Sequence, residues 1–594
     1  MTADLFAQAL STHIAGDLAE AERLYRAVLA IDPRHVLART NLATAWLQAG
    51  RLDEGVEALR RSLEIDPRQA GALNNLGGAL NALGCADEAV DAYRQAIAVQ
   101  PDYAEARANL AGLLHGQGMA LRGQGRLEEA LPILREAADL APAGAQGAVA
   151  LNDLGVTLLD LGRPADAVEA LGRALAIDPA YAAALNNRAL ALHALNRLDE
   201  ALMGYDAALA LEPQAAGFWL NRAEPLCALG RFDEALASLD QTLALEPRDA
   251  EARARRGDIL GYLGRIDDAR ADYEAALAID PSAWRAAFHL AFPLLRAGRY
   301  EEGLALYEQR WAGALKDAVV ELPRPLWLGE TSAAGKTLLL HSEQGHGDTL
   351  MMLRYAPLLA RQGATVILSV QPPLERLAAV VEGVSAVIPQ DQPLPPYDLH
   401  IPMMSLPLAL GTRLQTVPGE PYLKAPDAER AHWAERLGPR RRPRIGLCWS
   451  GNPTQKDDRW RSLALARLAP LFDLDADLYA LQTEMADADR LVLRGSPIHD
   501  LSAELRSYAD TAAAMEAMDL VITVCTSAAN LAGGLGRPTL VMLGAVADWR
   551  WGDGHDRSPW YPSARLFRQA RIGAWDEVAA RVKAAAEAFI RPGR

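Results

Sequence analysis

A loop in the second half of the chain gathers hydrogen-bond donors and cations directly after an apolar run. The run RIGLCWS ends at Ser450, and GNPTQKDDRWRS follows it. Its donors and cations are Ser450, Gly451, Asn452, Lys456, Arg459 and Arg461. Fixed cations and amides lower the barrier of a reaction that leaves a phosphate, because they stabilise the charge that develops on it. The loop predicts an anion site, and the alternative is a solvated surface loop.

A second turn of this kind carries a carboxylate and an imidazole. The apolar run TLLLH is followed by EQGHGD, where Gly345, His346, Gly347 and Asp348 precede an amphipathic helix. A carboxylate at a strand end, facing a cleft, suits general-base catalysis, with His346 as the substitute base. The alternative is that Asp348 caps the helix that begins at Thr349, a contribution of about 1 kcal/mol.

A third candidate is the segment VCTSAANLAGGLGRP, which follows the apolar run DLVITV. It places Thr526 and Ser527 at the N-terminus of a helix, where backbone N–H groups and hydroxyls form an anion site. Asn530, further along the same helix, can also donate a hydrogen bond. The three segments therefore predict one polar site built from several strand ends.

The elements before these segments form a repeat array. A proline closes each unit, and most of these prolines stand 34 residues apart, which is the tetratricopeptide (TPR) period. A small residue such as Ala21 or Gly55 precedes each proline by twelve positions, which lets two helices approach closely. The closing prolines are Pro33, Pro67, Pro101, Pro142, Pro179, Pro213, Pro247 and Pro281. We expect a TPR superhelix of eight repeats plus a capping helical pair over residues 1–311.

One column of the array carries carboxamides, eight residues after the closing proline. Its asparagines are Asn41, Asn75, Asn109, Asn187 and Asn221, with Asp153 and Arg255 in two other units. A carboxamide both donates and accepts, so a ladder of them can hold an extended peptide by its backbone. The column resembles the asparagine ladder of the eukaryotic O-linked N-acetylglucosamine transferases. The alternative is that these side chains bond a neighbouring helix or turn.

The second half alternates short apolar strands with helices, which is typical of parallel sheets. After a linker at 312–336, strands are expected at 337–341, 365–370 and in SAVIP and DLHIP, with a helix at 427–437. The pattern restarts with RIGLCWS, DLYALQ, DLVITV and TLVMLG. We therefore expect two Rossmann-like lobes, 337–438 and 439–594, with a ligand cleft at the carboxyl ends of their strands. This is the GT-B glycosyltransferase architecture.

Over roughly residues 320 to 590 the chain resembles bacterial TPR proteins whose C-terminal domain is similar to family 9, heptosyltransferase-like, glycosyltransferases. The segments that carry the resemblance are EQGHGDTLMMLRYAPLLARQGATVILSVQPPL, RIGLCWSGNPTQKDDRWRSL, DTAAAMEAMDLVITVCTSAANLAGGLGRP and DWRWGDGHDRSPWYPSARLFRQ. A TPR array on such a domain also resembles the flagellin glycosyltransferases, in which the repeats recruit flagellin.

The resemblance implies specific roles. Asp348 is the candidate base that deprotonates the acceptor hydroxyl, Lys456 matches the family's lysine at the donor phosphates, and Gln482 lies near the nucleotide. Transfer is expected to be inverting and independent of metal and cofactor, with a nucleotide sugar as substrate. The chain departs from its relatives at Cys525 and Asn530, where they carry aspartate and histidine. The departure suggests either a donor that carries a carboxylate, such as a cytidylyl-linked nonulosonic acid, or lost catalysis.

Composition excludes other classes. The formal net charge is −16, which argues against nucleic acid as the main partner. The four cysteines are scattered without metal or disulfide spacing. The first residues lack a basic start followed by an apolar run, and no apolar run of about 18 residues occurs. We therefore expect no signal peptide and a cytoplasmic protein without membrane insertion.

The sequence therefore favours a protein O-glycosyltransferase that moves a sugar to Ser or Thr of a protein bound in the TPR groove. One alternative acceptor is a lipid-linked saccharide, which the acidic composition opposes. The other is a non-catalytic TPR scaffold with a relic GT-B domain.

Overall fold

The computed structural model describes residues 2–313, 315–316, 322–452 and 458–591. By contacts, the chain divides into two compact units, Met1–Pro247 and Arg248–Arg594. The repeat pattern in the sequence ends at residue 311, which predicts the end of the repeat domain there, and this domain boundary remains a prediction. The contact boundary falls earlier because the last repeat helices share a core with the sheets, as described below.

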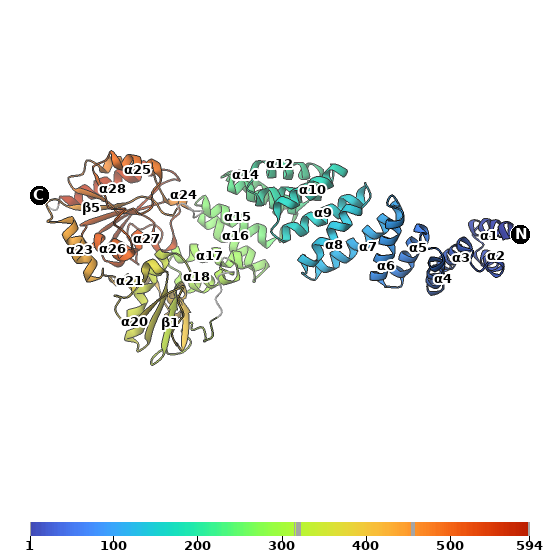
Figure 1. Ribbon diagram of the computed structural model, residues 1–594. Coiled ribbons are helices and arrows are strands. Elements are labelled where there is room, and N and C mark those ends of the chain that lie inside the picture. Colours follow the sequence, from blue (N-terminus) through green and yellow to red (C-terminus); the bar gives the residue numbers. More distant parts are fainter. Residues whose placement is uncertain (1, 314, 317–321, 453–457, 592–594) are drawn as a thin grey trace. The chain divides into compact units, whose positions relative to one another are not determined.

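The first unit is a run of paired helices, coloured blue to green in Figure 1. In chain order these are α1 (Thr2–Ile14), α2 (Leu18–Ile31), α3 (Val36–Gln48), α4 (Leu52–Ile65), α5 (Ala70–Ala82), α6 (Ala86–Val99), α7 (Ala104–Gly123), α8 (Leu127–Leu140), α9 (Ala145–Asp160), α10 (Pro164–Ile177), α11 (Ala182–Ala194), α12 (Leu198–Leu211), α13 (Ala216–Ala228) and α14 (Phe232–Leu245). The pairing continues into the second unit with α15 (Ala250–Tyr262), α16 (Ile266–Ile279), α17 (Trp284–Arg296) and α18 (Tyr300–Tyr307). An all-α TPR solenoid is thus confirmed.

Each helical pair is held by the small residue that the sequence places in its second helix. Ala21 is 0% exposed, and a Cβ added at Gly55 would lie 2.3 Å from a methyl of Leu47. The turn between paired helices uses a residue in the left-handed region, such as Gly50 with a φ of 77°. In one repeat Asn196 takes this place with a φ of 59°, which asparagine tolerates better than most residues.

The second unit contains two parallel sheets (Figure 1). The first has the order β3-β2-β1-β4 and the second β10-β9-β8-β5-β6-β7. The strands are β1 (Thr337–His341), β2 (Thr365–Val370), β3 (Val384–Pro389), β4 (Leu399–Pro402), β5 (Arg444–Cys448), β6 (Asp477–Ala480), β7 (Ile498–Asp500), β8 (Leu520–Val524), β9 (Thr539–Leu543) and β10 (Ala564–Arg568). Parallel-strand sheets of an α/β region are therefore present in the second half, as the alternating pattern predicts.

Helices cover the sheets and supply the rest of the core. They are α19 (His346–Met352), α20 (Ala356–Arg361), α21 (Glu375–Ala378), α22 (Leu406–Ala409), α23 (Asp427–Leu437), α24 (Asp458–Arg461), α25 (Asp487–Arg494), α26 (Tyr508–Glu516), α27 (Ser527–Gly534) and α28 (Trp575–Ile590). On the second sheet, α25 and α28 pack on one face, and α26 and α27 on the other (Figure 1). The central strands β5 and β8 are buried on both faces, which explains their mostly apolar sequences.

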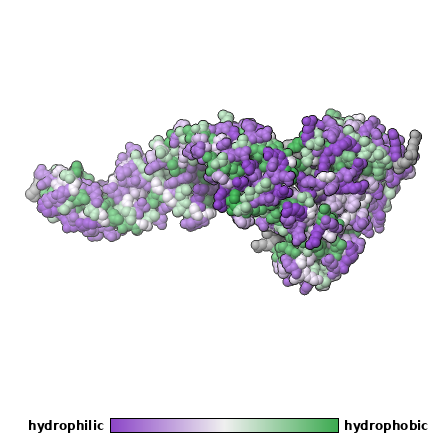
Figure 2. All heavy atoms as spheres, turned by 180° about the vertical axis from the view of Figure 1, so that it is seen from behind, coloured by the Kyte–Doolittle hydropathy of each residue, from purple (hydrophilic) through white to green (hydrophobic). Residues whose placement is uncertain are grey.

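The surface mixes polar and apolar residues. Figure 2 shows hydrophilic residues interspersed with hydrophobic ones over the face that it draws. Strongly exposed apolar side chains, such as Ile14, Met203 and Leu491, lie far apart in sequence on different helices. In the described part of the chain, no helix combines the length and apolar character that crossing a bilayer requires.

Candidate functional sites

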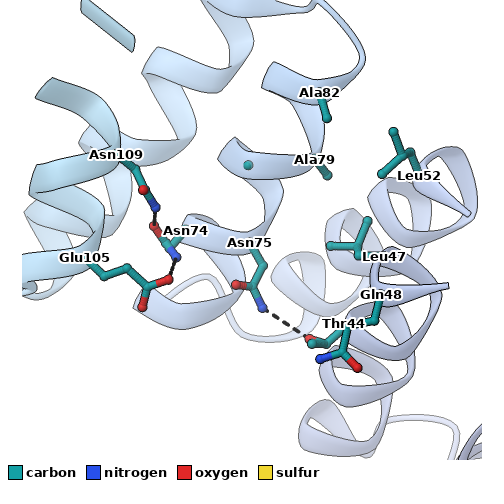
Figure 3. Close-up of a pocket in the computed structure, with 11 residues that line it drawn as sticks. Thr44, Leu47, Gln48, Leu52, Asn74, Asn75, Ala79, Ala82, Glu105 and Asn109 are labelled. Atoms are coloured by element: carbon teal, nitrogen blue, oxygen red, sulfur yellow. Dashed lines mark hydrogen bonds between the residues drawn. The ribbon is translucent and has the colours of Figure 1, made fainter. Parts of the chain in front are cut away.

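A groove of about 360 Å³ opens along the first helices of consecutive repeats (Figure 3). Its polar lining includes two of the predicted peptide-binding asparagines, Asn75 and Asn109. The full lining is Thr44, Leu47, Gln48, Leu52, Asn74, Asn75, Gly78, Ala79, Ala82, Glu105 and Asn109. Amides, a hydroxyl and a carboxylate thus lie beside small and aliphatic side chains, a mixture that suits an extended peptide.

The carboxamides of this groove also bond to one another across the repeats. Asn75 Nδ2 donates to Thr44 Oγ1 at 3.2 Å, and Asn109 Nδ2 donates to Asn74 Oδ1 at 2.9 Å (Figure 3). Asn74 in turn donates to Glu105 at 3.2 Å. The arrangement predicted as the alternative, bonding to a neighbouring helix, is therefore present. It consumes one N–H of each amide and leaves the second N–H and the oxygen of Asn75 and Asn109 for a ligand.

The same cross-repeat bond recurs further along the array. Asn187 Nδ2 donates to Asn152 Oδ1 at 2.9 Å, and Asn221 Nδ2 donates to Asn186 Oδ1 at 3.1 Å. Asn41, at the start of the column, lies near the hydroxyl of Tyr25 and opposes the rise that burial causes in the pKa of that tyrosine. All five predicted asparagines thus occupy half-buried positions on first helices and belong to side-chain networks.

In the second unit, Asp348 lies at the start of α19, just after β1. Its Oδ2 accepts the backbone N–H of Gly345 at 3.1 Å, so Asp348 caps the helix from its third position, because α19 begins at His346 and not at Thr349. Its Oδ1 accepts from Arg550 Nη2 at 2.6 Å. Asp348 is 20% exposed and Arg550 is 10% exposed, so this ion pair is mostly sheltered. The carboxylate of Asp348 therefore both caps α19 and pairs with Arg550.

Arg550 joins this cluster from the segment after β9. Its Nε lies 3.1 Å from Asp548, so the guanidinium faces two carboxylates. Burial alone lowers the pKa of Arg550, but Asp548 and Asp348 outweigh burial and raise it. The guanidinium is consequently a permanent positive charge beside the predicted base.

A hydrogen-bonded chain connects the predicted catalytic turn with the predicted anion site. His346 Nδ1 lies 3.2 Å from the hydroxyl of Tyr508, which donates to Ser527 Oγ at 2.9 Å. Burial lowers the pKa of His346, which favours the neutral imidazole. Because the hydroxyl hydrogen of Tyr508 goes to Ser527, Nδ1 is the donor in this chain and Nε2 is the acceptor. Thr526 is the N-cap of α27, and its side chain makes no capping bond.

The first turns of α19 and α27 are in contact. A Cβ added at Gly347 would lie 2.8 Å from Asn530 Nδ2 and 3.4 Å from Ser527 Cα, so only glycine fits there. Asn530 is 2% exposed, and its Oδ1 accepts from the hydroxyl of Tyr561 at 2.8 Å. Asn530 thus lies beside Gly347 of the turn before Asp348, and its oxygen is already engaged within the protein.

Gln482 holds the predicted anion loop in shape. Its Oε1 accepts from the backbone N–H of Trp449 at 3.1 Å and of Ser450 at 3.2 Å. Its Nε2 donates to the carbonyl of Glu484 at 2.7 Å. The side chain therefore orients the loop that follows β5 and shows no unengaged carboxamide oxygen to a nucleotide.

The rest of this loop is only partly described. The N–H of Gly451 donates to Ser462 Oγ at 2.7 Å, and Asn452 is exposed. Lys456 lies outside the described residues. The backbone of Arg459 belongs to α24, but its side chain lies outside what the structure describes. The cations predicted for donor phosphates are thus represented here by Arg461, which contacts Asp458 at 3.2 Å.

Cys525 stands between these groups as a packed thiol. Trp551 Nε1 donates to its Sγ at 2.9 Å, and burial raises the pKa of the thiol to about 11. A thiol with this pKa is not a nucleophile near neutral pH. Within the described residues no three His, Cys, Asp or Glu side chains gather as a metal site would require.

Comparison with known proteins identifies the first half of the chain. Tetratricopeptide-repeat families match residues 13–80, 68–143, 109–180, 152–216, 226–260 and 254–318. This chain is a tetratricopeptide-repeat protein. Repeats of this type indicate a protein-binding scaffold.

The TPR protein is similar to Protein FlbA of Caulobacter vibrioides, with 29% identity over 336 residues. The match covers 51% of this chain and 55% of FlbA, so the chain spans about half the length of the curated relative.

Among solved structures, YrrB is described as a TPR protein with an unusual peptide-binding site. It is 20% identical, covers 33% of this chain and 96% of its own, and superposes with a TM-score of 0.27. Yeast Tom70 is 17% identical, and the match covers 54% of this chain and 77% of the Tom70 chain with a TM-score of 0.28.

The TPR protein has a carboxylate near the turn of Asp348 that the sequence did not single out. Glu343 follows β1, is 4% exposed, and accepts from Arg310 at 3.2 Å and from the N–H of Met404 at 3.1 Å. Its Oε2 is buried with no hydrogen-bond partner among the described residues. Burial raises the pKa of Glu343 to about 7, against the opposing effect of Arg310. The only sequence signal was its place in the strand-end turn EQGHGD.

Proposed function

We propose that this TPR protein is a glycosyltransferase that modifies a protein held by its repeats. One observation carries the proposal: turns that follow strands of two separate parallel sheets meet, with Asp348 of the first facing Arg550 of the second. Ligands of such sheets bind at the carboxyl ends of the strands. A carboxylate, a neutral imidazole and a helix N-terminus are therefore close together where a donor and an acceptor would meet.

The proposed reaction is a single displacement. The oxygen of an acceptor Ser or Thr attacks the anomeric carbon of the nucleotide sugar while the bond from that carbon to the phosphate oxygen breaks. Asp348 takes the hydroxyl proton, with His346 as the substitute base. Ser450, Thr526 and Ser527, together with Lys456, stabilise the negative charge of the leaving nucleotide. No metal enters this scheme.

The repeats supply the acceptor. The groove of Figure 3 offers amide N–H groups and oxygens at half-buried positions, which suits an extended segment of a partner protein. Flagellin is the first acceptor to test, and a nucleotide-linked nonulosonic acid is the first donor.

The test is intact-mass spectrometry of proteins that co-purify with the full chain from cells that carry or lack its gene. We expect a sugar-sized increment on a bound partner with the wild type, and its loss with Asp348→Asn. Asp427→Asn, on the exposed start of α23, is the matched control and should keep the increment. A partner that binds the chain but has the same mass whether it comes from cells that carry the gene or from cells that lack it contradicts transfer to protein.

A non-catalytic scaffold is the second candidate, and a specific observation favours it. Asn530, Gln482 and the N–H of Gly451 are already hydrogen-bonded inside the protein. Partner binding without any transferred sugar, on protein or on lipid-linked saccharide, is the result that would select this candidate.

A further inference from the structure

The last helical pair of the array shares a hydrophobic core with the first sheet. Ala291 and Leu295 of α17 and Leu304 of α18 belong to the cluster that includes Leu338 and Leu340 of β1. Sharing a core fixes these helices relative to the sheet, because close-packed interiors allow little relative movement. α17 and α18 therefore belong to the same core as the strand that leads into the turn of Asp348, and α18 contacts α22, which follows β4.

A buried arginine follows α18, in the short helix η1 (Glu308–Ala312). The side chain of Arg310 is 0% exposed and donates to Glu308 at 2.6 Å and to Glu343 at 3.2 Å. It also donates to Ser405 Oγ at 2.6 Å, after β4. One guanidinium thus joins the end of the array to the segments that follow two strands of the first sheet.

A tyrosine makes a second link to the same turn. The hydroxyl of Tyr307 and the carboxamide of Gln344 exchange hydrogen bonds at 2.8 and 3.0 Å. The residue after Gln344 is Gly345, whose N–H holds Asp348 Oδ2. A short covalent and hydrogen-bonded path therefore runs from the array's last helix to the carboxylate of Asp348.

We propose that Arg310 and Tyr307 are positioning residues for the turn 342–348. They make the terminal helical pair a structural part of the site that contains Asp348. The meaning of this arrangement for catalysis rests on the proposed function. The positioning itself does not, because it can be measured on the turn directly.

The experiment uses the full chain with Tyr307→Phe, which keeps the ring packing and removes only the hydroxyl, and Arg310→Gln as a second variant. Tyr25→Phe is the matched control, since Tyr25 is also fully buried and its hydroxyl bonds His13 within the array. Hydrogen exchange of peptides that contain residues 342–352 is measured together with kcat and KM for transfer.

We expect exchange of these amides to rise at least about fivefold in Tyr307→Phe, because the variant loses both hydrogen bonds to Gln344 and one neutral hydrogen bond alone accounts for that factor. Exchange should rise further in Arg310→Gln and stay unchanged in Tyr25→Phe. For transfer we expect kcat to fall with little change in the acceptor's KM. Unchanged exchange in both variants, or raised exchange with an unchanged kcat, would overturn the proposal. A wild type that transfers no sugar while the exchange still rises would reject the proposed function and leave the positioning intact.

Discussion

Replacing Glu343 with glutamine should remove a pH dependence from the stability of the second unit. The folded chain holds the proton of Glu343 more tightly than the unfolded chain, with a pKa of about 7 against an ordinary 4.5. The free energy of unfolding therefore falls as pH rises from about 4.5 to about 7, because the buried carboxyl must ionise. This pKa difference corresponds to about 3 kcal/mol once pH exceeds the folded value. In Glu343→Gln the contribution is absent, while both hydrogen bonds to the side-chain oxygen can persist.

The assay is guanidinium unfolding followed by tryptophan fluorescence, from about pH 4 to about pH 8, which spans this transition. The two proteins should be nearly equally stable at the acidic end, and the variant should be more stable by about 3 kcal/mol at the alkaline end. Glu301→Gln is the matched control, since Glu301 is 83% exposed on α18 and should show no such divergence. A difference between wild type and Glu343→Gln that is flat with pH, or that grows toward acid, would refute the reasoning.

Three further predictions concern stability and binding. Asp348→Asn should lower the free energy of unfolding by about 2 kcal/mol by removing the charged partner of Arg550, checked by denaturant titration with Asp427→Asn as reference. Gly55→Ala should cost about 1–3 kcal/mol because the new methyl would meet a leucine side chain at 2.3 Å. Gly112→Ala is the control for Gly55→Ala, because a Cβ added at Gly112 would have nothing within 4 Å, and thermal melts of both variants should show it to be neutral or stabilising. Asn109→Ala should weaken partner binding. It should also lower the free energy of unfolding by about 1–3 kcal/mol, because the buried acceptor Asn74 Oδ1 of the preceding repeat loses its donor. Unchanged affinity in calorimetry together with unchanged melting would contradict a role of the asparagine column in both binding and stability.

The sequence was most informative where a regular period governs packing. The strands expected at 337–341 and 365–370 have the same bounds in the structure, because unbroken apolar runs between turns define buried strands. β7, with three residues, and β10, in which one of five residues is exposed and one half-buried, were not predicted. Short or one-sided strands leave too little periodicity to distinguish them from loops.

Side-chain direction accounts for the rest. Gln482 was expected beside a nucleotide from its strand-end place, but the structure turns its oxygen to two backbone N–H groups. The partners of Arg310 include Ser405, 95 residues away in sequence. Local spacing cannot indicate such a contact, because it depends on how distant elements pack. Strand ends could therefore be predicted as a site, whereas the bonds inside the site could not.

The core that α17 and α18 share with the first sheet sets limits on how this protein can be recombined. In repeat proteins each repeat contacts only its neighbouring repeats. The repeats before Arg248 can therefore be gained, lost or exchanged during evolution with local consequences. The terminal pair is different: its apolar residues share a core with the first sheet, and the arginine that follows it, Arg310, bonds to the turn beyond β1. A chimera that joins a foreign array to this sheet region should therefore be spliced ahead of α17, and the terminal pair should be inherited with the sheets as one module.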